Sequence, residues 1–198
     1  MPTTTDPTFY RSPAEAIAAP PERLAYVAAY DPAGTAKDAM SVVDTDPSSP
    51  GYGRVVGWAE LPTAGNELHH FGWNACSSAL GHAGHGDGGQ PLERRYLIGP
   101  GIRSSRTYVL DTKPDPRSPK VVREITAEEL ARKAGYSRPH TVHCGPGGIV
   151  GGHVGQPLRR RRDRVGRAAV EGRIRRLGHR PSSLRASRSV GRPKRVIV

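Results

Sequence analysis

The chain has 198 residues, 35% of them hydrophobic, with 24 glycines, 19 prolines and a formal net charge of +12 at neutral pH. This length predicts one domain or a fragment of a larger one, and the many Gly and Pro residues favour short strands and turns over long helices. No segment is long and apolar enough to cross a membrane, and the N-terminus lacks the basic region and apolar run of a secretory signal, so we expect a cytoplasmic protein.

The pattern of apolar residues predicts a chain built mainly from short strands. One short helix is expected over residues 126–133, because Thr126 is a suitable N-cap, Glu129 stands at the capping-box spacing and Gly135 would end the helix. The glycine-rich segment 81–90 is predicted to be a loop. The predicted strands are 24–30, 39–44, 54–60, 67–76, 95–98, 106–111, 120–125, 139–144 and 148–150.

Two elements recur along the chain at similar spacing. An Asp-Thr-x-Pro sequence begins at Asp44 and again at Asp111, and each copy is followed by a histidine-bearing strand, with His70 and His140 at corresponding places. A repeat of this kind, with several strands in each copy, is typical of propeller blades. Two blades alone would leave open edges and could not close a ring.

The candidate metal ligands are His69, His70, His140 and His143. Imidazole is neutral near pH 7 and suits a borderline transition metal. On a regular strand, adjacent residues and residues three apart face opposite ways, so at most one histidine of each pair would face a common site unless a bulge intervenes. We expect His70 to do so together with His140 or His143. The alternative is that these histidines hydrogen-bond strand ends and bind no ion.

The two cysteines, Cys76 and Cys144, lie beside the histidine clusters. They form no CxxC motif and no disulfide framework, which fits a reducing cytoplasm. A thiolate at either position could bind copper or take up selenium, whereas a free cysteine is more commonly a small buried residue. Trp73 is expected to pack between blades, and Arg103 with Arg106 to make structural hydrogen bonds rather than an anion site.

Four segments of the chain carry a recognisable pattern: ELHHFGWNACSS (67–78), GIRSSRTYVLDT (101–112), RPHTVHCGP (138–146) and DTDPSSPGYGRVV (44–56). These segments resemble the selenium-binding protein family, whose better-defined members are methanethiol oxidases. The resemblance runs from about Ser12 to about Ile149 and implies a seven-bladed β-propeller that oxidises methanethiol to formaldehyde, hydrogen sulfide and hydrogen peroxide, with copper implicated. We therefore predict an all-β fold over residues 1–157, comprising about two blades of a partial propeller.

The sequence departs from this family in two ways. Family members are more than twice this length, so only the first third of the pattern is present. Mammalian members carry a selenium-linked cysteine just after an SPxY motif, whereas here Tyr52 is followed by Gly53.

A small thiol would be the substrate of the full-length parent. We expect this fragment to be inactive, because an open ring lacks the remaining ligands. The competing hypothesis is a selenium- or metal-binding protein without turnover.

The excess positive charge lies entirely in the last part of the chain. Residues 1–157 contain 15 Lys+Arg and 16 Asp+Glu, whereas residues 158–198 contain 15 and 2. We predict that this tail is disordered or weakly helical, since it shows neither strand alternation nor aromatic residues. If genuine, it could bind nucleic acid non-specifically, through phosphate contacts with Arg159, Arg160, Arg161 and Arg162.

A second hypothesis explains the tail better. Its Arg, Gly, Ala, Ser and Pro residues are those that GC-rich DNA encodes out of frame, so we propose that the coding frame shifts near residues 150–157. Resequencing of the DNA across this region is expected to reveal an inserted or missing base that restores further β-rich repeats. An intact frame, together with a tail peptide from the purified protein, would contradict this hypothesis.

Overall fold

The computed structural model describes residues 6–77, 80, 93–145 and 148–154, and the side chains of these residues except 144, 145 and 148–150. The predicted glycine loop (81–90) and the basic tail (158–198) lie outside the described residues. Within them, no helix is long and apolar enough to span a membrane.

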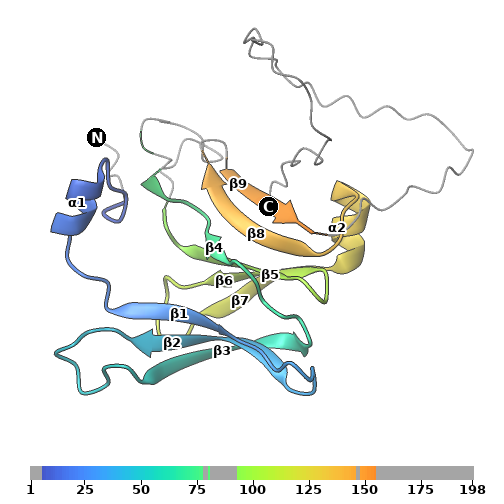
Figure 1. Cartoon of the computed structure of the whole chain (residues 1–198), viewed down its shortest axis with the longest axis horizontal. Helices are drawn as coiled ribbons and strands as arrows, with labels where there is room; N and C mark the ends of the chain where they lie inside the picture. The colour runs from blue at the N-terminus through green and yellow to red at the C-terminus, as the bar shows by residue number, and fades with distance from the viewer. Residues whose placement is uncertain (1–5, 78–79, 81–92, 146–147, 155–198) are drawn as a thin grey trace, which may run out of the picture.

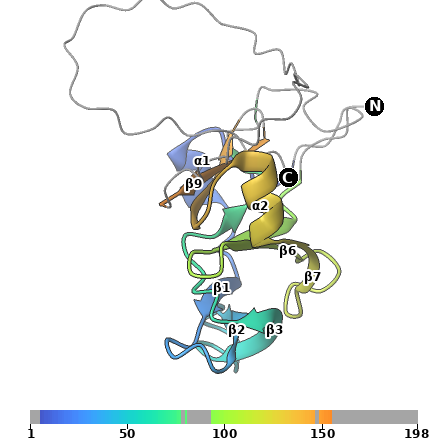
Figure 2. The ribbon, with the colours of Figure 1, turned by 90° about the vertical axis from the view of Figure 1, so that its right-hand side faces the viewer.

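Three antiparallel sheets make up most of the described chain, and they lie one above another in Figure 1 and Figure 2. The first sheet has the order β1-β2-β3, the second β4-β5-β6-β7, and the third pairs β8 with β9. The predicted all-β class is therefore confirmed, and the three sheets do not close into a ring. The strands are β1 Leu24–Ala29, β2 Lys37–Asp44, β3 Val55–Ala64, β4 Gly72–Trp73, β5 Tyr96–Gly101, β6 Arg106–Asp111, β7 Lys120–Ile125, β8 Pro139–Gly145 and β9 Gly148–His153.

Apolar side chains between neighbouring sheets form two core clusters. Removal of these side chains from water is the main favourable contribution to the stacking of the sheets. The smaller cluster lies between the second sheet and β8 and comprises Ile98, Val109 and Val142, with Tyr96 packed against it. The larger cluster joins the first and second sheets and comprises Met40, Ala59, Leu61, Leu68, Leu97, Tyr108 and Leu110.

The Asp-Thr repeat of the sequence is also a repeat of the structure. The Thr45 N–H donates to the Arg23 carbonyl at 2.9 Å in the first sheet, and the Thr112 N–H donates to the Arg95 carbonyl at 3.1 Å in the second. In each sheet the preceding aspartate accepts a hydrogen bond from the backbone N–H two residues later. An equivalent turn therefore follows an equivalent β-hairpin in the first and in the second sheet.

Strand register extends this equivalence to whole strands. Leu24 of β1 lies opposite Asp44, and Tyr96 of β5 lies opposite Asp111. Strand β1 thus corresponds to β5, β2 to β6 and β3 to β7. Strand β4, which pairs with β5, has no counterpart beside β1 among the described residues.

One loop fastens the first sheet to the second. It runs between β6 and β7, and its Pro116 carbonyl accepts a hydrogen bond from the Tyr26 hydroxyl at 2.9 Å. Arg117 lies 3.8 Å from the carboxylate of Asp44. A Cβ atom on Gly57 of β3 would overlap the Arg117 carbonyl oxygen, so only glycine allows β3 to approach this closely.

The two helices illustrate one confirmed prediction and one omission. Helix α2 (Ala127–Ala134) begins after Thr126, whose hydroxyl accepts from the Glu129 N–H, and ends at Gly135 in the left-handed conformation, as predicted. Helix α1 (Pro13–Ala18) was not predicted. The sequence nevertheless contains the usual signals for the start of this helix, because Ser12 caps the Glu15 N–H and proline occupies the first turn.

The segment 67–76, predicted as one strand, is regular only at Gly72–Trp73. Glu67 and His70 have φ angles of 54° and 35°, in the left-handed region that interrupts an extended strand. The chain therefore bends where the first histidine pair stands.

Candidate metal centre

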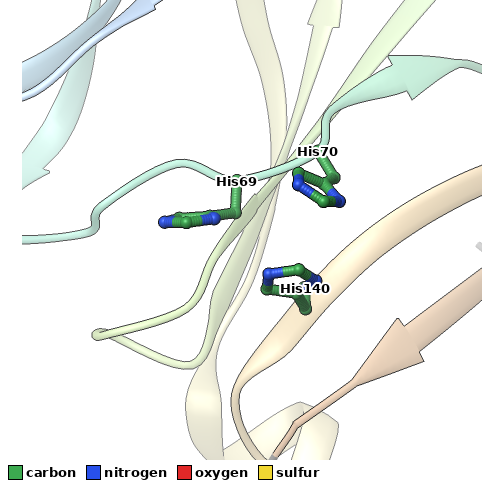
Figure 3. A group of neighbouring side chains, drawn as sticks. All are labelled: His69, His70 and His140. Carbon is green, nitrogen blue, oxygen red and sulfur yellow. The ribbon is translucent and has the colours of Figure 1, made fainter.

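Three of the four predicted histidines lie together in the structure (Figure 3). His69 and His70 precede β4, and His140 stands near the start of β8. The ring centre of His140 is 5.1 Å from that of His69 and 4.4 Å from that of His70. One ring nitrogen from each histidine lies within 4.8 Å of the others. Segments far apart in the sequence thus supply one group of imidazoles.

The backbone bend explains why both adjacent histidines reach His140. In a regular strand, His69 and His70 would face opposite sides of the sheet. The left-handed φ of 35° at His70 removes this alternation, so both rings face the same partner. The expectation that only one histidine of this pair would reach the site does not hold.

His143 is the predicted ligand that the structure places elsewhere. It lies on β8, which is regular from Thr141 onward in its pairing with β9. His143 is exposed and is not part of the three-histidine group. His140 stands at the register shift between Pro139 and Thr141, so the irregular part of β8 lies at His140 and not at His143.

Hydrogen bonds orient two of the three rings. The Nε2 atom of His69 lies 3.2 Å from Oε1 of Glu67, whose other oxygen pairs with Arg103 at 2.8 Å. The Nδ1 atom of His140 lies 2.9 Å from the Thr141 hydroxyl. These contacts leave Nδ1 of His69 and Nε2 of His140 for an ion. A carboxylate or hydroxyl on the outer nitrogen is the usual partner of a metal-binding histidine.

The surroundings of His140 favour its neutral form. Desolvation lowers the pKa of this imidazole below its usual value, and the neighbouring His70 and His69 rings lower it further. A neutral imidazole has the free lone pair that a metal needs.

The donor set fits a transition metal such as copper. Imidazole suits copper, zinc, iron and nickel, and metal–nitrogen bonds of about 2.0–2.1 Å place tetrahedral ligand atoms about 3.4 Å apart. The nitrogens here lie within 4.8 Å of one another, so a modest inward movement of the rings would bring them to the spacing of metal ligands. His70 is exposed, which leaves the group accessible from solvent.

A buried carboxylate holds the histidine segment in place. Asp38 of β2 is 0% exposed, and its Oδ2 atom accepts hydrogen bonds from the N–H groups of Asn66 and Glu67 at 2.6 and 2.9 Å. The Asn66 side chain is in turn held by the Tyr108 hydroxyl at 2.8 Å. Sequence reasoning missed Asp38, although a carboxylate within a largely apolar strand is an unusual residue to bury.

Cys76 is disulfide-bonded in the structure, whereas the sequence indicated no disulfide framework. The sequence contains one other cysteine, Cys144, whose side chain lies outside the described part. A sulfur in a disulfide is not a thiolate. A copper or selenium role for either cysteine therefore stays a prediction for the reduced protein.

The remaining predicted side chains have structural partners. Trp73 packs edge-on against Tyr26, with ring centres 5.6 Å apart, which confirms its position between the first two sheets. Arg103 donates to the Pro32 carbonyl and Arg106 pairs with Glu124, so both arginines act as structural links. Arg159, Arg160, Arg161 and Arg162 lie outside the described residues.

Comparison with known protein families decides the family. The profile of the 56 kDa selenium-binding proteins matches residues 3–160. The chain belongs to this family. It is 44% identical to selenium-binding protein 2 of Arabidopsis thaliana over 137 residues, which are 68% of this chain and 27% of that protein. It is 39% identical to a methanethiol oxidase of Xenopus laevis over 151 residues, which are 75% of this chain and 30% of that protein.

A solved structure supports the same assignment. The X-ray structure of a hypothetical selenium-binding protein from Sulfolobus tokodaii is 52% identical, with a TM-score of 0.69. The match covers 76% of this chain and 32% of that one. This member of the selenium-binding family therefore spans about a third or less of the length of the relatives it matches.

We predict that Asp38→Ala destabilises the protein, because two buried N–H groups lose their acceptor. The free energy of unfolding, measured by urea denaturation, should fall by about 1.5–3 kcal/mol. The matched control is Asp38→Asn, whose amide oxygen can still accept both bonds and should retain most of the stability. Equal stability of Asp38→Ala and the parent protein would show that Asp38 does not hold the segment.

Proposed function

We propose that the chain carries a metal-binding histidine site of a methanethiol oxidase-like protein, with copper as the metal. One observation carries the proposal: ring nitrogens of His69, His70 and His140 lie within 4.8 Å of one another. The relatives named methanethiol oxidase and the sequence resemblance support the choice of copper and of a small thiol substrate.

In this proposal each residue has a separate task. His69 through Nδ1, His140 through Nε2 and the exposed His70 would hold the ion, while Glu67 fixes the ring of His69. Copper would supply one-electron redox chemistry and an open position for sulfur or dioxygen. The overall reaction converts methanethiol, dioxygen and water into formaldehyde, hydrogen sulfide and hydrogen peroxide, in which the methyl carbon is oxidised and dioxygen is reduced.

The architecture supports a partial propeller as the setting of this site. Three stacked sheets, two of them sharing the same hairpin and turn, are what consecutive blades would give. The sequence predicts about two blades, and we propose that β8 and β9 belong to a third. The chain covers 27–30% of two representative relatives, so the described sheets correspond to only part of the fold of those relatives.

Non-catalytic binding of a metal or of selenium is the alternative, favoured by the relatives named selenium-binding proteins.

Nucleic-acid binding by the basic tail stays a prediction, recognisable by steep salt dependence. A cytoplasmic location also stays a proposal.

We expect His69→Ala, His70→Ala and His140→Ala each to weaken Cu(II) binding by about tenfold or more, because each removes a direct ligand. Competition titration gives the affinity, and electron paramagnetic resonance gives the number of bound nitrogens. His143→Ala is the matched control, since His143 shares β8 with His140 but lies outside the group. Equal affinity of all four variants would place the copper elsewhere.

We expect the copper-loaded chain to produce no hydrogen sulfide from methanethiol and dioxygen above the level of copper alone. The physical reason is that three imidazoles in an open ring leave the reacting sulfur without the rest of its site. Hydrogen sulfide and hydrogen peroxide formed in equal amounts, and abolished by His140→Ala, would show instead that this portion of the family fold suffices for turnover.

A further inference from the structure

Left-handed backbone at residues other than glycine is concentrated around the histidine group. In the part of the chain that the structure describes, Glu67 and His70 have φ angles of 54° and 35°, and Ser105 and Arg138 have φ angles of 57° and 55°. Such angles are strained for a residue with a Cβ atom and persist only where surrounding contacts hold them. All four residues belong to the two histidine segments or to the turn between β5 and β6. The histidine segments are residues 66–70 and 138–142, and the turn is residues 102–105.

The turn between β5 and β6 is bonded to the first histidine segment. The Ile102 N–H donates to the Glu67 carbonyl at 3.2 Å, and the Arg103 N–H donates to the Asn66 carbonyl at 3.1 Å. The Arg103 guanidinium also pairs with the Glu67 carboxylate at 2.8 Å. Because the other oxygen of that carboxylate lies 3.2 Å from Nε2 of His69, the Arg103 side chain acts on the orientation of the His69 ring.

The same turn is bonded to the second histidine segment through a side chain. The Ser105 hydroxyl oxygen accepts a hydrogen bond from the Arg138 N–H at 2.9 Å. The Arg138 carbonyl accepts from the Val154 N–H at 3.1 Å, so both backbone polar groups of Arg138 have partners. One four-residue turn therefore contacts both of the segments that supply histidines.

His140 needs such contacts because strand pairing does not hold it. The register of β8 with β9 shifts at His140, which has no opposite residue on the described strand β9. Two residues further along, the Val142 N–H donates to the His70 carbonyl at 3.1 Å. His140 thus lies between two anchored residues, Arg138 and Val142, and Ser105 anchors the first of them.

We propose that Arg103 and Ser105 are positioning residues of the histidine group. Ser105 sets the place of His140 along β8, and Arg103 sets the ring of His69 through Glu67. The proposal rests on the metal site proposed above and deepens it, because it assigns a role to two residues that would not touch the ion. Ligands that are already in place bind an ion more tightly, since less conformational freedom is lost on binding.

Both contacts lie near the surface, and this determines what their loss should change. The Arg103 side chain is 50% exposed, so water and salt screen its pairing with Glu67. The bond from Arg138 to Ser105 is also exposed, so water can replace the hydroxyl oxygen as an acceptor. Water satisfies the N–H but does not fix the position of Arg138. Loss of either side chain should therefore change the arrangement of the histidines more than the stability of the fold.

Ser105→Gly tests the role of the hydroxyl in the full chain. Glycine adopts the left-handed φ of this position without strain, so the turn is kept and only the hydroxyl is lost. We expect the urea midpoint of unfolding to stay close to that of the parent, while Cu(II) affinity falls about fivefold. The matched control is Ser104→Gly, because the Ser104 hydroxyl accepts from the Arg106 N–H within the same hairpin. This control should change the affinity by less than about twofold.

Arg103→Met and Arg103→Lys test the role of the guanidinium. Methionine removes the charge at a similar side-chain length, so Cu(II) affinity should fall about threefold, and this difference should shrink at high salt. Lysine keeps a positive charge beside Glu67 and should restore the affinity of the parent. Arg106→Met is the matched control, since Arg106 pairs with Glu124 of β7 rather than with a histidine segment.

Nuclear magnetic resonance of the metal-free chain separates this proposal from the proposed function. Ring protons of His70 and His140, whose ring centres are 4.4 Å apart, should show nuclear Overhauser contacts that weaken in Ser105→Gly. The His69 Nε2 proton, which is held by a carboxylate, should exchange with water faster in Arg103→Met. If the parent binds no copper, the proposed function fails, whereas these two signals still decide the positioning roles.

Two results would overturn the proposal. The first is parent-like ring contacts and proton exchange in both Ser105→Gly and Arg103→Met, which would show that the turn does not arrange the histidines. The second is an equal fall in affinity and in stability for Ser104→Gly and Ser105→Gly, which would give the turn a general structural role only.

Discussion

The histidine group depends on the two hydrogen bonds that Asp38 accepts from the N–H groups of Asn66 and Glu67. The segment they hold contains left-handed φ angles at Glu67 and His70, and such angles cost about 1–3 kcal/mol each for residues other than glycine. The segment can keep this conformation only if surrounding contacts oppose the strain. A buried carboxylate in the first sheet thereby fixes side chains that face the third sheet. Glu67 adds a second constraint, because it binds both His69 and Arg103.

The sheets relate to one another through repetition. The first and second share a hairpin, a turn and a strand register, but among the described residues only the second sheet has a further strand, β4, beside the first strand of its hairpin. The segment that leads into β4 also carries His69 and His70. The same stretch of chain therefore completes a sheet and supplies metal-ligating groups, and these two tasks explain its irregular shape. Asn74 and the short β4 satisfy the edge, while the bend before β4 directs two imidazoles toward His140.

Local signals allowed part of this to be predicted from sequence. Strands β6 and β7 were predicted with their observed bounds, and α2 within one residue, because alternation and capping are local patterns. The grouping of His70 with His140 followed from the internal repeat. The contribution of His69 did not, because left-handed backbone at a residue other than glycine leaves no signal in the sequence. Asp38 was missed because its role depends on a contact between segments distant in the sequence.

The loop between β6 and β7 has a geometric consequence. Through Pro116 and Arg117 it contacts β1, the end of β2 and the bare backbone of Gly57, so it spaces the first sheet from the second. A spacer of this kind sets the angle between neighbouring sheets. In any ring assembled from such sheets, that angle determines how many fit before the circle closes. A single glycine and the length of one loop can therefore influence the symmetry of the whole assembly.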